Sequence, residues 1–230
     1  MINLELRQGL LASLADLEAG DTVLVGLSGG ADSLSLLKCA VVVGKAQSIN
    51  VGAIIIDHQI QAESAKTSQV AAQVATDLGA DPVLIFNVDV ATGPGSGGME
   101  AAARDARRQA FARVAVEHNA KAILLGHTLE DQAETVLLGL ARGSGARSLS
   151  GMRAAEGIYR RPFLNVDRET VRSEVKDLVA FEDPHNSDTK FARVRVRNSV
   201  LPSLESELGP GVTQALVRSA DLLRDDADAL

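Results

Sequence analysis

The segment VGLSGGADSL, residues 25–34, joins an apolar run to two adjacent glycines, an aspartate and two serine hydroxyls. Glycines let the backbone turn tightly and expose its N–H groups, and hydroxyls add further donors. A helix that begins near Asp32 would point its positive end at the same spot. The segment therefore predicts a cradle for phosphate or another anion, formed by Ser28, Gly29, Gly30, Ala31 and Ser33.

This cradle matches neither of the two common phosphate-binding patterns. The lysine of the G-x-x-x-x-G-K-[ST] loop is missing, and the G-x-G-x-x-G spacing of dinucleotide-binding proteins is absent. Asp32 is unusual here because a carboxylate beside phosphates would repel them. It is either the N-cap of the helix, facing away, or a ligand for Mg²⁺ that joins the carboxylate to the phosphates.

A second polar segment follows residue 125 and reads GHTLEDQAET. Asp131 and Glu134 are three residues apart, so in a helix both lie on one face near its N-terminus. Such a pair can bind Mg²⁺, or hold an ammonium group and take its proton. Acidic residues also stabilise helix N-termini without any further role, and the sequence leaves this alternative open.

Histidine and cysteine have plainer interpretations. His58 and His127 each follow an apolar run, and we expect them to form hydrogen bonds at loop ends rather than to bind a metal. Cys39 lies among aliphatic residues on the helix after the cradle, where a small buried hydrophobic residue is expected. A single cysteine excludes an intramolecular disulfide and any multi-cysteine metal or iron–sulfur site.

Buried strands and helices alternate along the first part of the chain and can position these groups. Aliphatic runs without polar alternation predict strands at 22–27, 51–56, 83–86 and 122–125, and a fifth near 158–160. Helical patterns lie between them, at about 32–44, 64–78, 99–119 and 129–141. The alternation predicts an α/β fold with an open parallel sheet and helices on both faces.

A small helical unit is expected after about residue 165. Asp167 can cap a helix over about 168–180, Asn186 and Asp188 turn the loop that follows, and helices continue over about 192–207 and 211–228. We therefore divide the chain into a nucleotide-binding catalytic domain at 1–165 and a helical appendage at 166–230. The glycine-rich stretches 93–98 and 143–151 are either mobile loops beside a site or plain connectors.

Composition and charge limit the classes to which the protein can belong. A chain of 230 residues that is 46% hydrophobic can bury a core. Its apolar runs are far shorter than the roughly 18 residues of a membrane helix, and the N-terminal segment lacks a signal-peptide pattern, so we expect a cytoplasmic protein. The net charge of −7 argues against nucleic-acid binding. Residues 100–200, however, hold 17 Lys and Arg against 14 Asp and Glu, with arginine, which suits phosphate, in excess.

The cradle sequence SGGADS after the first strand resembles the pyrophosphate loop of the N-type ATP pyrophosphatases, which split ATP into AMP and pyrophosphate. Further blocks resemble one subgroup of that family, the tRNA(Ile)-lysidine synthetases. These blocks are GHTLEDQAET, EAAAR at 100–104, LARGSG at 140–145, RPFL at 161–164, and EDPHNSD at 182–188 with Arg193 and Arg197. The resemblance extends from residue 22 to about residue 225.

The resemblance implies a two-step reaction on an isoleucine tRNA with a CAU anticodon. ATP, with Mg²⁺, adenylates the ring carbonyl oxygen of the wobble cytidine, and the amine of free lysine then displaces AMP to give lysidine. It also implies the strand order 3-2-1-4-5, in which the loops after residues 27 and 125 face each other across one crevice.

The resemblance also implies roles for individual residues. The cradle from Ser28 to Ser33 binds ATP, Asp57 after the second strand contacts the adenosine, and Asp32 holds Mg²⁺. Asp131 or Glu134 holds the lysine ammonium, whose ordinary pKa of about 10.4 means that it must lose a proton before attack. The implied catalytic residues are Asp32, Arg104, Asp131, Glu134 and Arg197, and the implied contacts to lysine or tRNA are Asp131, Glu134, Arg142, Arg193 and Arg197.

Two groups of arginines carry the expected phosphate contacts. Arg104 supplies a cation for the crowded phosphoryl group, with Arg107 and Arg108 one helical turn further on. Arg193 and Arg197 are four residues apart and share a helix face, whereas Arg195 points elsewhere. The alternative for Arg193 and Arg197 is that they are ordinary solvent-exposed surface residues without a ligand.

The chain departs from the family pattern in places. Glu130 and Asp131 stand where some relatives have two aspartates, and Thr128 stands where some have a histidine. Longer relatives carry further C-terminal domains that help to recognise tRNA, so the chain is either of the short kind or truncated. A tRNA thiolase, which usually needs paired cysteines, and a non-catalytic nucleotide-binding module are the alternative functions.

Overall fold

The computed structural model describes residues 2–57, 64–88, 99–143, 145–178, 180–181 and 188–229. The side chains of residue 64 and of residues 99–105 are outside this description. His58, Asn186 and the glycine-rich stretch 93–98, which the sequence singled out, also lie outside the described residues.

One six-stranded sheet forms the centre of the molecule, in the order β3-β2-β1-β4-β6-β5. All neighbouring strands pair in parallel except β5, which pairs antiparallel with β6 at one edge. The strands are β1 (Thr22–Gly26), β2 (Asn50–Asp57), β3 (Val83–Asn87), β4 (Ala120–Leu124), β5 (Ala155–Glu156) and β6 (Tyr159–Arg160). The predicted order of the first four strands and the fifth strand near residue 158 are confirmed, and strand order reverses between β1 and β4.

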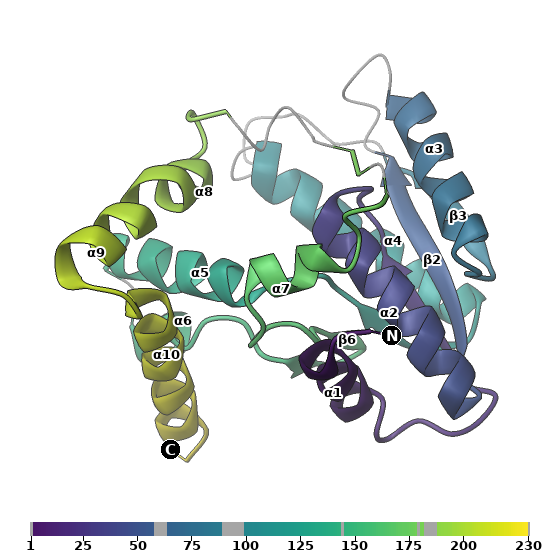
Figure 1. Ribbon diagram of the computed structural model, residues 1–230, viewed down its shortest axis with the longest axis horizontal. Helices are drawn as coiled ribbons and strands as arrows, with labels where there is room; N and C mark the ends of the chain where they lie inside the picture. The colour runs from purple at the N-terminus through teal and green to yellow at the C-terminus, as the bar shows by residue number, and fades with distance from the viewer. Residues whose placement is uncertain are drawn as a thin grey trace.

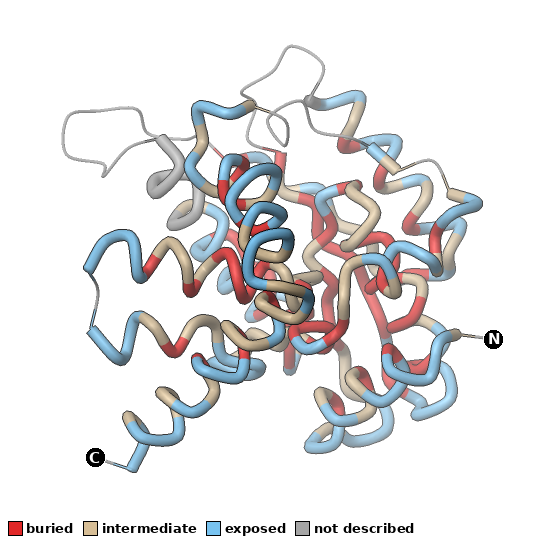
Figure 2. Tube along the Cα trace, turned by 60° about the vertical axis from the view of Figure 1, so that its left-hand side comes forward, coloured by how far each residue is buried: buried red, intermediate tan, exposed pale blue. Residues whose placement is uncertain are grey.

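Helices cover both faces of this sheet, as the sequence predicted (Figure 1). One face packs against α1 (Leu4–Ser13), α2 (Ala31–Gln47), α3 (Ser64–Asp77) and α7 (Arg168–Ser173), and the other against α4 (Met99–Glu117). In β1, Val23 and Val25 belong to the first core and Leu24 to the second, and all three are fully buried. Burial on both faces explains the strand's unbroken apolar run, and Figure 2 shows buried residues concentrated along the sheet.

A helical unit packs around α5 (Leu129–Ala141), which begins just after β4. Its members are α6 (Ala146–Leu149), α8 (Ala192–Arg195), the π-helical turn η2 (Val196–Val200), α9 (Leu201–Leu208) and α10 (Val212–Ala229). Ala133 of α5 joins Val196, Leu201 and Val217 in a separate apolar cluster. The division at residue 165 stays a prediction, and α7, which follows it, packs into the core of the sheet through Val171.

Two C-terminal helices differ in detail from the prediction. α7 ends at Ser173 rather than near residue 180, and the chain continues in turns with three-residue spacing: the Val175 amide donates to the Arg172 carbonyl at 3.2 Å and the Leu178 amide to the Val175 carbonyl at 3.0 Å. The Lys38 ammonium of α2 also donates to the Glu174 carbonyl at this point. The helix expected over 192–207 is interrupted by η2, in which the Leu201 amide donates to the Val196 carbonyl. Pro202 follows directly, and its missing N–H removes a regular helical bond at this point.

Among the described residues, no helix is both long enough and apolar enough to cross a bilayer.

Candidate active site

The anion cradle forms where β1 passes into α2. Gly29 has φ +81°, a backbone conformation that residues with a side chain rarely adopt. The Ser33 hydroxyl donates to the Gly30 carbonyl at 2.9 Å and accepts from the Ser28 amide at 3.2 Å. Because Gly30 is the N-cap of α2, the first turn of the helix starts within the cradle. The alternative that Asp32 is the N-cap is therefore wrong, since this residue lies inside the helix.

Two neighbouring segments border the cradle. The Phe181 amide donates to the Gly29 carbonyl at 2.9 Å, which fastens the segment after α7 to the cradle. Asp57 ends β2, beside β1, and its side chain is buried at the same carboxyl edge of the sheet.

The loop after β4 lies directly against the start of α2. A Cβ atom at Gly126 would lie 3.0 Å from the Asp32 carbonyl oxygen and 3.2 Å from the Ser33 Cα atom. This contact is closer than ordinary van der Waals packing and admits only a glycine without a shift of the backbone. The cradle and the start of α5 therefore meet at one place, as the strand order implied.

Asp131 and Glu134 are held at the first turns of α5. The Thr128 amide donates to Asp131 Oδ2 at 2.9 Å, and the Thr128 hydroxyl donates to Glu130 Oε2 at 2.9 Å. Asp131 is 8% exposed and Glu134 is fully buried. A carboxylate that is removed from water to this extent requires charged or hydrogen-bonding partners.

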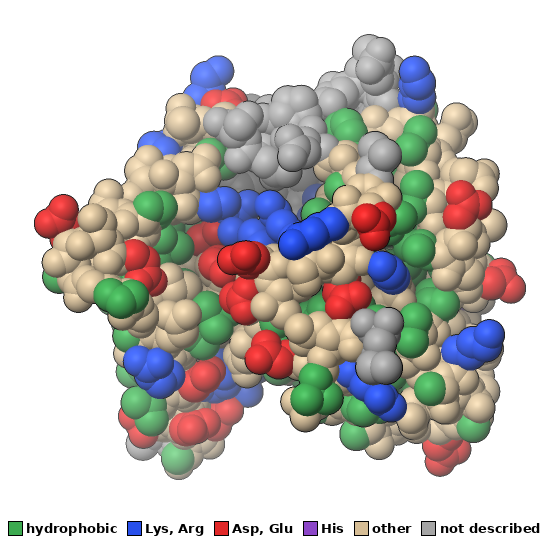
Figure 3. Space-filling model, viewed as in Figure 1, with side chains coloured by type: hydrophobic (Ala, Val, Ile, Leu, Met, Phe, Trp, Pro, Cys, Tyr) green, Lys and Arg blue, Asp and Glu red, His purple; other side chains and the backbone are tan. Residues whose placement is uncertain are grey.

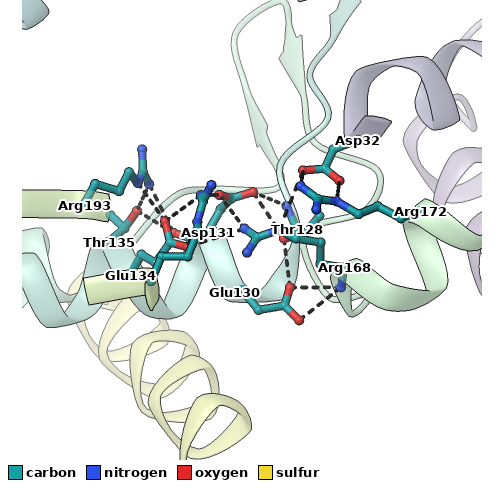
Figure 4. A network of polar contacts seen from close by, with 10 residues as sticks. Asp32, Thr128, Glu130, Asp131, Glu134, Thr135, Arg168, Arg172 and Arg193 are labelled. Carbon is teal, nitrogen blue, oxygen red and sulfur yellow. Dashed lines mark hydrogen bonds and ion pairs between the residues drawn. The ribbon is translucent and has the colours of Figure 1, made fainter. Parts of the chain in front are cut away.

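Arginines from the helical unit supply some of those partners (Figure 4). Arg197 donates from Nε to Glu134 at 2.7 Å and from a terminal nitrogen to Asp131 at 2.8 Å. Arg193 donates from Nε to Glu134 at 3.0 Å. The prediction that these two arginines share a helix face is confirmed, and so is the separate orientation of Arg195, which donates to backbone carbonyls of the preceding loop.

Sequence reasoning missed two further members of the site, Arg168 and Arg172 on α7. Arg168 lies 3.0 Å from Asp131, 3.4 Å from Glu134 and 3.6 Å from Asp32. Arg172 binds both carboxylate oxygens of Asp32, at 2.7 and 3.3 Å. The one signal that could have found them is their spacing of four residues, which places both on one helix face, as for Arg193 and Arg197.

Positive and negative charges are thus interleaved across the site. Figure 3 shows Lys and Arg side chains beside Asp and Glu side chains in the middle of the molecule, between the sheet and the helical unit. Burial alone would raise the pKa of Asp131, but the Arg168 guanidinium, the Thr128 amide and further neighbours such as Arg197 together outweigh burial and lower the pKa below its usual value. Asp131 is therefore ionised at neutral pH.

A pocket of about 200 Å³ opens beside these charges. Its lining includes both carboxylates and guanidiniums, and Glu134 is paired there with Arg168 and Arg197. The pocket is lined by Glu130, Glu134, Arg168, Arg197, Leu201, Pro202, Glu205 and Thr213.

Some predicted residues lie elsewhere or outside the described part. Arg142 is exposed at the C-cap of α5, about 16 Å along the helix from Asp131 at 1.5 Å per residue, so the structure does not bring it to the acidic pair. Arg108 pairs with Glu156 at 3.8 Å and stacks on Tyr159. Arg104 lies in α4, and its side chain is outside the described residues.

The expectations for Cys39 and Asp188 are confirmed, whereas the hydrogen bond expected for His127 is not, because its buried Nδ1 has no hydrogen-bond partner among the described residues. Cys39 is fully buried, and burial raises the pKa of its thiol to about 12. Burial lowers the pKa of His127 to about 4, so its ring is neutral at pH 7. Asp188 accepts from the Lys190 amide at 3.0 Å and turns the chain before α8. No group of three His, Cys, Asp or Glu side chains suited to a metal ion occurs in the described part of the chain.

Comparisons with known proteins agree with this arrangement. A family model described as a PP-loop domain matches residues 4–204. The chain is 51% identical over 227 residues to the tRNA(Ile)-lysidine synthase of Thermobifida fusca, covering 97% of this chain and 69% of that protein. It is 50% identical over 213 residues to the enzyme of that name from Streptomyces coelicolor, covering 90% of this chain and 60% of that protein.

The chain thus spans about two thirds of the length of these curated relatives. Among solved structures, the U34-tRNA thiolase NcsA from Methanococcus maripaludis with its 4Fe-4S cluster matches with a TM-score of 0.75. It is 21% identical, and the match covers 96% of this chain and 78% of that chain. This second likeness concerns the fold.

Proposed function

Because the chain belongs to the PP-loop family and, within it, to the tRNA(Ile)-lysidine synthases, we propose that it ligates lysine to a tRNA at the expense of ATP. The proposed target is the wobble cytidine of tRNA(Ile) with a CAU anticodon, in the cytoplasm. ATP first adenylates the ring carbonyl oxygen with release of pyrophosphate, and the lysine amine then displaces AMP. A single cysteine, fully buried, argues against the thiolase alternative.

The single observation that carries this proposal is the meeting of the cradle and the acidic pair. Gly126 lies against the start of α2, and Arg168 contacts carboxylates on both α2 and α5. A nucleotide in the cradle and an amine beside α5 would therefore face the same reacting base.

In the proposed first step, the cradle binds the phosphates of ATP. Backbone N–H groups at Gly29 to Ala31 and the positive end of α2 stabilise negative charge, and Asp57 at the end of β2 contacts the adenosine. Arg104 is the proposed cation that stabilises negative charge on the phosphoryl group.

The residues present fit a magnesium ion bound together with ATP. Mg²⁺ usually takes one or two carboxylates plus substrate phosphates, and Asp32 provides one carboxylate in the first turn of α2, at the edge of the cradle. When bound, the ion would neutralise phosphate charge. Arg172 now occupies both oxygens of Asp32, so this arginine must release the carboxylate in exchange.

In the proposed second step, the pocket beside α5 holds lysine. Glu134, with Asp131, attracts the ammonium group, while Arg197 in the same wall can bind the amino-acid carboxylate. Deprotonation of the ammonium near these carboxylates would free the nitrogen for attack. Arg193 and Arg197 keep 30% and 27% of their side chains exposed, so they remain accessible to phosphate groups of the tRNA.

The test combines the protein with ATP, Mg²⁺, lysine and a CAU-anticodon tRNA. We expect lysidine in the tRNA and AMP release that depends on lysine, whereas a thiolase or a passive nucleotide binder would give neither. Asp131→Ala should keep ATP affinity but lose product, while Gly29→Val should weaken ATP binding by crowding the cradle at a positive φ. Absence of lysidine with the unmodified chain would refute the proposed function.

A further inference from the structure

Arg168 occupies a singular position among the described residues, because it alone contacts carboxylates at the starts of both α2 and α5. Its guanidinium reaches Asp131 and Glu134 of α5 at 3.0 and 3.4 Å, and Asp32 of α2 at 3.6 Å. Figure 4 shows its side chain between the acidic pair and Asp32. These residues are far apart in the sequence, so the arginine joins two separate elements of the site.

The backbone of Arg168 is fixed as firmly as its side chain. Its amide donates to both carboxylate oxygens of Glu130, at 3.1 and 3.0 Å. It is the first residue of α7, whose N-cap Asp167 accepts from the Thr170 amide. α7 in turn packs on α2 through the fully buried Val171. Arg168 is therefore anchored to the same body as the cradle.

The other arginines of the site are less enclosed. The side chain of Arg168 is 14% exposed, compared with 27% for Arg197, 30% for Arg193 and 52% for Arg172. Arg193 and Arg197 also come from the helical unit rather than from the body that carries the cradle. These three side chains are more accessible to solvent, whereas Arg168 is enclosed by the carboxylates that it binds.

The two buried carboxylates of α5 require a nearby positive charge. Asp131 and Glu134 lie on one helix face and are largely removed from water, so their negative charges repel each other strongly without a cation between them. Arg197 also donates to both carboxylates, at 2.7 and 2.8 Å, but Arg168 adds the contact to Asp32 and so links the pair to the start of α2. It thereby sets the distance from the nucleotide side of the site to the amine side.

We propose that Arg168 is a positioning residue that holds the acidic pair of α5 in register with Asp32 beside the cradle. This inference rests on the proposed function, and it assigns Arg168 to the lysine-transfer step rather than to ATP binding. The residue acts through the carboxylates, because its terminal nitrogen is already engaged by Asp131 and Glu134.

The variants Arg168→Gln and Arg168→Lys test this assignment, with Arg195→Gln as the matched control. Arg195 is an arginine on α8 whose guanidinium donates to the carbonyls of Thr189 and Lys190, away from the acidic pair. Five quantities are measured for each protein: the melting temperature, the ATP dissociation constant, the pyrophosphate release without lysine, the kcat for lysine and the KM for lysine.

For Arg168→Gln we expect ATP affinity and lysine-independent pyrophosphate release within about threefold of the unmodified protein. The kcat/KM for lysine should fall by about 100-fold, the scale of a misplacement of about 1 Å in a catalytic group. Arg168→Lys should recover part of that loss, since an ammonium can hold one carboxylate but cannot span three. The control should match the unmodified protein in every quantity.

Two results would overturn the inference. One is an unchanged kcat/KM for lysine in Arg168→Gln. The other is an equal loss of ATP affinity and lysine transfer, which would assign the arginine to general stability. If the unmodified protein makes no lysidine at all, the proposed function itself fails, so the two failures are distinguishable.

Discussion

Substitution of Gly126 by alanine tests the contact that joins the two halves of the site. The new Cβ atom would lie 3.0 Å from the Asp32 carbonyl oxygen, 3.2 Å from the Asp32 carbonyl carbon and 3.2 Å from the Ser33 Cα atom. All three are backbone atoms, which cannot rotate away as a flexible side chain would. The start of α2 must therefore move by several tenths of an ångström, and the cradle moves with it.

The cost of this overpacking is about 1–3 kcal/mol. For a chain of this size, each kcal/mol lowers the melting temperature by about 2–4 °C, so we expect a decrease of about 2–12 °C. ATP affinity and lysidine formation should fall as well, because the cradle shifts relative to α5. Differential scanning calorimetry, ATP titration and product analysis measure these effects.

Gly145→Ala provides the matched control, since a Cβ atom at Gly145 meets nothing within 4 Å and the residue has no left-handed backbone. Because Gly145 is the N-cap of the four-residue α6, alanine should lower the melting temperature by no more than about 2–4 °C, and activity should equal that of the unmodified protein. If Gly126→Ala also melts and turns over as the unmodified protein does, the two segments do not have the close contact described, and the reasoning on the site is refuted.

Other predictions concern single residues. Glu134→Gln should lower the free energy of unfolding by about 3–5 kcal/mol in urea titration, because it leaves clustered guanidiniums without their buried counter-charge, and a loss below 1 kcal/mol would contradict this. Glu205 accepts from the first amides of α10, and these bonds with Thr213 lower its pKa to about 2. The stabilisation that the ionised Glu205 gives to the folded protein is therefore complete above pH 4.5 and disappears as the pH falls toward 2. Glu205→Ala should lower the free energy of unfolding by about 1 kcal/mol at pH 7 and by much less at pH 2.5. Glu207→Ala is the control. An equal loss at both pH values would count against this. Cys39 should not react with a thiol reagent in the native protein but should react after denaturation, and rapid native labelling would contradict its burial.

Much of the fold could be predicted because the strands are buried on both faces. Burial on both faces leaves runs such as Val23 to Val25 without polar residues, and these are visible in a single sequence. The two-residue strand β5 was missed, since two residues are too few to show a pattern. The end of α7 was misplaced because the helical pattern runs on into turns with i to i+3 hydrogen bonds, which the sequence does not distinguish from a continuing helix.

The candidate site was only partly predictable. The cradle and the acidic pair are local motifs, and their residues share a turn or a helix face, which spacing alone reveals. Arg168 and Arg172 meet their partners across long sequence separations, so their role depends on how α7 packs on α2. Arg142 was assigned to the site because its block, LARGSG, resembles the family pattern. The length of α5 instead places Arg142 at the C-cap, at the opposite end of the helix from Asp131.

The position of Arg193 and Arg197 in the sequence determines which parts of the chain must stay together. Glu134 lies on the helix that leaves the sheet, yet Arg193 and Arg197, which compensate its charge, come from near the C-terminal end of the described chain. A fragment that retains the sheet and α5 but omits those helices would expose the apolar residues of α5 and leave Glu134 with Arg168 as its remaining arginine among the described contacts. We therefore expect the nucleotide-binding half to need its C-terminal helices when it is excised or grafted onto another protein.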